Sequence, residues 1–126
     1  MASSSIDTGT FAGTIRQDIH ETARQLNAAL GPTLVSLLAG SKNRRAASRW
    51  ADPQGAQPRS EAHKRLLAAH EVWVQIAGNE NEHVARNWFI GANPRLNDRS
   101  PIECLREGKL AEVKSAARAF LSGTDD

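Results

Sequence analysis

Apolar residues recur at spacings of three and four along most of the chain after its first dozen residues. In the first such stretch Ile15, Ile19 and Leu26 fall on one helical face, because 3.6 residues complete a turn of an α-helix. A half-buried strand would instead alternate apolar and polar residues, and such alternation does not persist anywhere in the sequence. The pattern therefore predicts an all-α fold with no sheet.

Glycines and prolines divide this helical pattern into separate elements. Gly31 ends the first helix, Pro32 suits the first position of the second, and Gly40 ends the second. A turn at residues 52–55 precedes the longest apolar stretch. The expected helices span residues 15–31, 33–39, 43–51, 59–77 and 81–90, followed by a short helix that ends at Gly108 and a last helix that begins at Leu110.

The apolar side chains of these helices predict one continuous core. The second helix supplies Leu34, Leu37 and Leu38. The long helix carries two adjoining stripes, which are Ala62, Leu66, Ala69, Trp73 and Ile76, and beside them His63, Leu67, His70 and Val74. Because this helix is apolar over a wide arc and has no linker-like composition, the two halves of the chain are expected to pack as one body.

The composition excludes several classes of protein. Residues 1–13 are rich in Ser, Thr and Gly and predict a flexible arm, and a chain of 126 residues fits one domain or two very small ones. The single cysteine, Cys104, excludes an internal disulfide and is expected to be a small buried residue. No basic start followed by an apolar run indicates a signal peptide or a membrane span, so we expect a cytoplasmic protein without membrane contact.

Positive charge is concentrated in the middle third of the chain. Residues 40–70 contain seven basic and two acidic residues, a net charge of +5, whereas residues 1–39 carry −1 and residues 71–126 carry −2. This local concentration is the electrostatic footprint of a surface that faces phosphates. A solvated basic face without a partner has the same composition.

Within this basic third, the sequence LLAGSKNRRAASRW places a leucine-rich helix, a turn at Gly40 and a short basic helix in succession, which is the helix-turn-helix layout. In that layout the second helix enters the major groove of DNA, where an arginine can bond both acceptors of a guanine. Ala46 and Ala47 would leave room for close approach, and Trp50 would anchor the buried side. The residues expected to contact DNA are Lys42, Asn43, Arg44, Arg45, Ser48 and Arg49.

The C-terminal third contains a compact series of turn and cap signals. Asn93-Pro94 marks a turn, because a residue before proline is disfavoured in the helical region. Ser100 and Glu103 then form a complete capping box, with Pro101 at the first helical position between them.

The segment WFIGANPRLNDRSPIECLREGKLAEV, residues 88–113, resembles the C-terminal domain of the Xre/MbcA/ParS-type antitoxins, in which Asn-Pro-Arg-Leu, Arg-Ser-Pro and Leu-Arg-Glu-Gly stretches recur. The likeness extends to the basic helix that ends at Trp50. The resemblance implies that this domain binds a RES-type toxin, an enzyme that destroys NAD, and that its C-terminal end covers the toxin's active-site cleft. The residues expected at the partner surface are Asn93, Arg95, Leu96, Arg99, Arg118, Phe120, Leu121 and Ser122.

The connection between Leu38 and Trp50 departs from the family pattern, because it is slightly longer than the usual Xre-type turn. Lys42 and Asn43 are therefore expected to protrude as a loop, which leaves the docking geometry on DNA open. The chain then divides into a flexible arm at 1–13, a helix-turn-helix region at 14–58, a connecting helix at 59–80 and a partner-binding domain at 81–126.

A helix-turn-helix of this size usually gains DNA affinity by dimerising, since two half-sites double the phosphate contacts. A homodimer is therefore expected. The double stripe on residues 59–77 offers a candidate contact, although the core of the protein's own fold is the better interpretation for most of those residues.

Enzyme chemistry finds no support in the sequence. His20, His63, His70 and His83 are scattered, and no two stand at the i, i+4 spacing of a helical metal site. The glycines form no phosphate-binding loop, and no Gly-x-Ser-x-Gly motif occurs. We expect no catalytic site, no metal and no cofactor.

Three functions of different class remain open. The first is an antitoxin that binds operator DNA as an autorepressor and neutralises a separately encoded RES-type toxin. The second is a stand-alone helix-turn-helix regulator or nucleoid-type DNA-binding protein without a toxin partner. The third is an interaction scaffold that does not bind DNA. A neighbouring reading frame for a RES-type enzyme would favour the first, and an isolated gene the second.

Overall fold

The structure is a computed structural model and describes residues 18–123. These residues form helices α2 (Ile19–Leu30), α3 (Pro32–Leu38), α4 (Ala46–Ala51), α5 (Ser60–Asn79), α6 (Glu82–Ile90), α7 (Pro101–Arg106) and α8 (Leu110–Ser122), with a 3-10 turn, η1 (Pro94–Leu96). The expected all-α fold is confirmed for this part of the chain, whose extended pairing is limited to one isolated bridge between Asn93 and Arg99. The expected arm at 1–13, and Ile15, lie outside the described residues.

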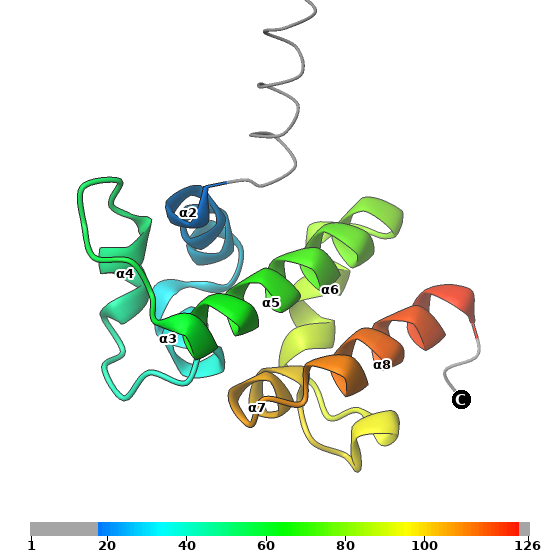
Figure 1. The fold of residues 1–126 in the computed structure, drawn as a ribbon. Helices are drawn as coiled ribbons and strands as arrows, with labels where there is room; N and C mark the ends of the chain where they lie inside the picture. Colours follow the sequence, from blue (N-terminus) through cyan, green and yellow to red (C-terminus); the bar gives the residue numbers. More distant parts are fainter. Residues whose placement is uncertain (1–17, 124–126) are drawn as a thin grey trace, which may run out of the picture.

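The long helix α5 crosses the middle of the molecule. Figure 1 shows α2, α3 and α4 near its N-terminal half, α6 and α8 near its C-terminal half, and α7 between α3 and α8. The most extensive helix pairing among the described residues joins α2 to α4, and α3 packs on α7 as well as on α2. None of the described helices has the length and apolar character that crossing a membrane requires.

Local signals set most of the helix ends where the sequence predicts them. Gly31 and Gly40 adopt φ of +89°, a left-handed conformation that suits glycine, directly after α2 and shortly after α3. Pro32 occupies the first turn of α3. At the start of α7 the Ser100 hydroxyl accepts from the Glu103 amide, and the Glu103 carboxylate accepts from the Ser100 amide, so the expected capping box is complete.

One helix start within the described residues differs from the prediction. Helix α2 begins at Ile19 after an extended Asp18, with ψ of 133°, whereas the expected start at Ile15 lies outside the described residues. The basic helix begins at Ala46 and not at Asn43. The Asn43 side chain accepts a hydrogen bond from the Arg45 amide, and this local turn competes with the helix at that point.

The buried side chains form one cluster that includes residues of every α-helix in the described chain. Trp50 is 8% exposed and Cys104 is 1% exposed, so both are buried as expected. Four apolar side chains that could have joined this core remain largely exposed instead, namely Leu37, Leu67, Val74 and Ile90.

The exposed side chains correct the predicted apolar faces. On α3 the buried positions are Val35, Ser36 and Leu38, while Leu37 is 39% exposed. On α5 the first stripe faces the core together with Ala68 and Val72, which belong to neither predicted stripe. Leu67 and Val74 lie on a ridge that no neighbouring helix covers, because α2 packs on one part of α5 while α6 and α8 pack on others.

Two arginines join the first half of the chain to the C-terminal segment. The Arg106 Nη1 donates to the carbonyl of Leu37 at 2.7 Å and to that of Ser41 at 3.2 Å, so α7 caps the end of α3. The Arg65 Nε of α5 donates to the carbonyl of Leu105 near the end of α7 at 2.9 Å. The carbonyls of Leu37 and Leu105 already accept from the backbone amides of Gly40 and Gly108, so each arginine adds a second hydrogen bond to a carbonyl near the end of a short helix.

Replacing Trp50 with Ala removes a buried indole and leaves a cavity between α4 and its neighbours. We expect Trp50→Ala to lower the free energy of unfolding by about 3–5 kcal/mol, measured by urea denaturation. As a control, Val74→Ala on the exposed ridge of α5 should change it by no more than about 0.5 kcal/mol. Equal effects of the two substitutions would contradict the burial of Trp50.

Candidate nucleic-acid interface and partner surface

The residues expected to contact DNA lie together on the loop between α3 and α4 and on α4 itself. All six side chains are exposed: Lys42, Asn43, Arg44 and Arg45 on the loop, and Ser48 and Arg49 on the helix. Lys42 and Asn43 lie on the connection between the end of α3 at Leu38 and the start of α4 at Ala46. The structure therefore brings this set to one region of the surface.

Short-range hydrogen bonds give the loop its shape. The Asn43 amide donates to the Ser41 hydroxyl at 3.0 Å, and the Asn43 side-chain oxygen accepts from the Arg45 amide at 2.9 Å. The Asn43 carbonyl then accepts from the Ala46 amide, which begins α4. Asn43 thus shapes the turn, and its side-chain oxygen is already engaged.

The fully buried Ser36 connects this loop to α3, a role that was not predicted from the sequence. Its hydroxyl lies 2.8 Å from the carbonyl of Pro32 and 3.1 Å from that of Arg44, and it accepts from the amide of Ala47 at 2.8 Å. One hydroxyl therefore fixes residues on both sides of the start of α4. The available signal was a lone serine within a leucine-rich helix.

The inner face of α4 is bonded to α2. The Asn27 side-chain amide donates to the carbonyl of Ala47 at 2.9 Å, and the Nδ1 of the buried His20 lies 2.7 Å from the carbonyl of Trp50. Ala46 and Ala47 are 8% and 0% exposed, so they pack inward and do not provide the close approach to DNA that the sequence suggested. This packing leaves Ser48 and Arg49 on the outer face.

The loop and α4 form an uncompensated positive surface. Residues 41–51 contain Lys42, Arg44, Arg45 and Arg49 and no acidic residue. Among residues 18–123, the ion pairs involve other arginines and lysines and leave these four cations unpaired. Exposed arginine and lysine side chains without an acidic partner are the groups that contact nucleic-acid phosphates.

Two residues expected at the partner surface are interior instead. Asn93 and Leu96 are 4% and 5% exposed. The Asn93 side-chain oxygen accepts from the Arg95 amide, and its backbone amide donates to the carbonyl of Arg99, so Asn93 organises the η1 turn. Leu96 belongs to the core cluster. Both residues support the exposed residues around them, and their own side chains add little to the accessible surface.

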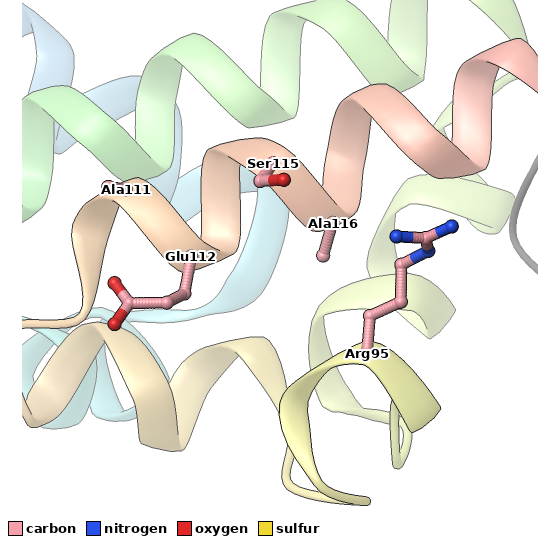
Figure 2. Close-up of a pocket in the computed structure, with 5 residues that line it drawn as sticks. All are labelled: Arg95, Ala111, Glu112, Ser115 and Ala116. Atoms are coloured by element: carbon pink, nitrogen blue, oxygen red, sulfur yellow. The ribbon is translucent and has the colours of Figure 1, made fainter.

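The other members of that set lie near or along α8. Figure 2 shows Arg95 extending from η1 beside Ala116 of α8, while Glu112 lies at the other end of a shallow hollow of about 280 Å³. Arg118 is exposed, two turns beyond Ala111 on the same helix. Arg99 forms an ion pair with Glu107, which engages its charge within the fold.

The end of α8 adds an apolar edge to this surface. The Phe120 ring lies 6.3 Å from the ring of Trp88 between centroids, and these two residues line an open hollow of about 350 Å³ with Val84 and Asn87. Leu121 is half-buried and Ser122 is exposed. Phe120 therefore contributes both to the core and to the candidate partner surface.

The capping box at Ser100 also lowers the pKa of Glu103 in the first turn of α7. The backbone amide of Ser100, and then its hydroxyl, hold the pKa of Glu103 below its ordinary value by hydrogen bonding the carboxylate. Burial raises the pKa of the Cys104 thiol. Within residues 18–123 no three His, Cys, Asp or Glu side chains gather as they would to hold a metal ion.

Replacing Ser36 with Ala leaves the Ala47 amide and the Arg44 carbonyl without this partner in a buried place. We expect Ser36→Ala to lower the free energy of unfolding by about 1–3 kcal/mol. Amide hydrogen exchange should show faster exchange at Ala47. Ser48→Ala, which removes a hydroxyl from the exposed face of the same helix, is the control and should leave both quantities nearly unchanged. Slow exchange at Ala47 in Ser36→Ala would refute the role given to this hydroxyl.

The basic loop with α4, and the surface along α8, are therefore the two candidate functional surfaces of the described chain. Comparisons of this chain with protein-family models, with curated proteins and with solved structures found no match.

Proposed function

We propose that this chain is an antitoxin that binds operator DNA through the loop between α3 and α4 and through α4. The observation that carries this proposal is the exposed basic surface of Lys42, Arg44, Arg45 and Arg49, which contains no acidic residue. The resemblance of residues 88–113 to the Xre/MbcA/ParS-type antitoxins supports the second part of the proposal, the neutralisation of a RES-type NAD-degrading toxin.

The basic surface divides into two parts with different roles on DNA. Lys42 and Arg44, exposed on the α3–α4 loop, would contact backbone phosphates, which provide affinity without sequence preference. Ser48 and Arg49 lie on the outer face of α4, and a helix presented to the major groove reads base edges with such side chains. Arg45, at the start of α4, lies between the two parts.

The proposed DNA-bound form is a homodimer, in which two copies contact two half-sites. The ridge of α5 that carries Leu67 and Val74 is the candidate contact, because both side chains are about half exposed on one side of a 20-residue helix. The stoichiometry of the DNA complex, measured by analytical ultracentrifugation, tests this point directly. One copy per operator would remove the dimer from the proposal.

Replacing Arg44, Arg45 and Arg49 together with Ala should weaken binding to the DNA upstream of this gene by roughly a hundredfold or more at physiological salt. The three side chains are exposed, so the far-ultraviolet circular dichroism should not change. Fluorescence anisotropy measures the affinity, and Arg118→Ala serves as a matched control on the opposite candidate surface. Unchanged affinity of the triple variant would sink the DNA-binding proposal.

The toxin-binding part rests on the surface along α8. Arg95 and Arg118 supply positive charge, and Phe120 with Leu121 supplies an apolar edge at the end of the helix. Arginine and aromatic side chains are the residues that most often dominate the energy of protein interfaces. We place this activity in the cytoplasm, where DNA and NAD are both present, and we assign the chain itself no catalytic step and no cofactor.

The partner proposal predicts a protein complex that can be captured. Full-length protein purified from its native cells should retain a stoichiometric partner, and this partner should consume NAD once it is released. Arg95→Gln combined with Arg118→Gln should weaken that complex by roughly tenfold or more, with Lys64→Gln on α5 as the control. Recovery of DNA without a protein partner would leave a stand-alone regulator in place of an antitoxin.

A further inference from the structure

A second feature of the basic region is a hollow beside the proposed DNA-contacting residues. It measures about 590 Å³ and lies where the α3–α4 loop, α4 and the start of α5 meet. Its walls come from several successive segments of the chain, from Ala39 to Arg65. Small-molecule sites usually enclose about 300–1,000 Å³, so the hollow has the size of a ligand site.

Three arginines from different segments line this hollow. Arg49 belongs to α4, Arg59 immediately precedes α5, and Arg65 lies on the second turn of α5. Glu61 is the acidic residue in the lining, and it pairs with Lys64 at 3.7 Å. The lining therefore carries two positive charges in excess, even before the charge of Lys64 is considered. A hollow of this kind favours a ligand with two negative charges.

Arg65 is held in place before any ligand arrives. Its Nε donates to the carbonyl of Leu105. A Cβ on Gly40 would lie 3.0 Å from its Nη1, and one on Gly108 would lie 3.4 Å from its Nη2, so the two glycines leave room for the guanidinium. Among residues 18–123 neither terminal nitrogen has a hydrogen-bond acceptor. A fixed guanidinium with unused donors is well suited to a phosphate, which accepts two parallel bonds.

The remaining lining is neutral and partly apolar. Trp50 and the small side chains Ala46 and Ala62 form one part of it, and Ser41, Asn43 and Gln57 add polar groups. This combination accommodates a phosphate together with the sugar or base attached to it. Acetate-sized anions would leave most of the volume unfilled.

We propose that the hollow lined by Arg49, Arg59 and Arg65 is a binding site for a phosphate group that belongs to a nucleotide unit. The phosphate comes either from a free nucleotide or from the backbone of DNA bound by the neighbouring loop. The second source rests on the proposed DNA-binding function, whereas the first does not. Because Asn43 and Arg49 also belong to the DNA-contacting set, a free nucleotide in the hollow would compete with DNA for these two side chains.

Two substitutions separate this site from the DNA-reading surface. Arg59 lines the hollow and lies outside the residues expected to contact DNA, while Arg44 belongs to those residues and does not line the hollow. Both side chains are exposed, and neither makes a side-chain hydrogen bond or ion pair to another described residue. Arg59→Gln and Arg44→Gln therefore form a matched pair, with Arg118→Gln as a remote control.

Isothermal titration of the full chain with ADP, orthophosphate and adenosine tests the free-nucleotide source. ADP should bind with a Kd below about 1 mM, and adenosine, which lacks phosphate, should not bind. Arg59→Gln should weaken ADP binding by roughly tenfold, while Arg44→Gln and Arg118→Gln should leave it unchanged. Equal binding of adenosine and ADP would overturn the phosphate assignment.

The salt dependence of DNA binding tests the second source. If the hollow holds a backbone phosphate, Arg59→Gln should make the negative slope of log affinity against log salt concentration shallower by about one. A slope that stays unchanged, together with no binding of ADP or orthophosphate, overturns the proposal. ADP binding that depends on Arg59 in a chain that does not bind DNA supports the site and refutes only the DNA-binding function.

Discussion

The carbonyl groups at the ends of two very short helices set the main constraint on this fold. Helices α3 and α7 contain seven and six residues, so a large share of their carbonyls have no amide donor within the same helix. Arg106 donates to the carbonyl of Leu37 near the end of α3 and to that of Ser41 beyond it, and Arg65 donates to the carbonyl of Leu105 near the end of α7. Each arginine comes from another helix, so the ends of both short helices are held by hydrogen bonds from distant parts of the chain.

This constraint also explains how the candidate surfaces are held. Helix α4 has six residues and would not be stable alone, because helix formation has a costly nucleus. Ser36, Asn27 and His20 bond its backbone from α3 and α2. The inner face supplies the attachment, so the outer face is free to carry Ser48 and Arg49. The same division holds at η1, where Asn93 shapes the turn and Arg95 projects from it.

The sequence predicts this fold well where the signal is local. A capping box spans four residues, and a glycine with positive φ ends a helix through its own backbone, so Ser100, Glu103 and Gly31 could be interpreted from neighbouring residues alone. The exposed positions of Lys42 and Arg44 also follow from their charge. These features require no knowledge of which helix packs on which.

The features that the sequence did not predict depend on contacts between distant residues. Leu67 and Val74 continue an apolar pattern, and only the arrangement of α2, α6 and α8 leaves them uncovered. The bonds of Arg65 and Arg106 join residues 40 or more positions apart. Asn93 and Leu96 belong to a recognisable motif, yet both are buried. The motif alone does not distinguish buried residues that support a surface from exposed residues that a partner could contact.

The position of Cys104 has a consequence for the chemistry of the whole chain. Its side chain is 1% exposed on α7, and burial raises the pKa of its thiol. Since the thiolate is the reactive form, both effects suppress alkylation and oxidation while α7 is in place. The only thiol of this protein therefore becomes reactive when α7 separates from its neighbours. The rate at which Cys104 is modified then reports how often the contacts between α7 and the rest of the chain open.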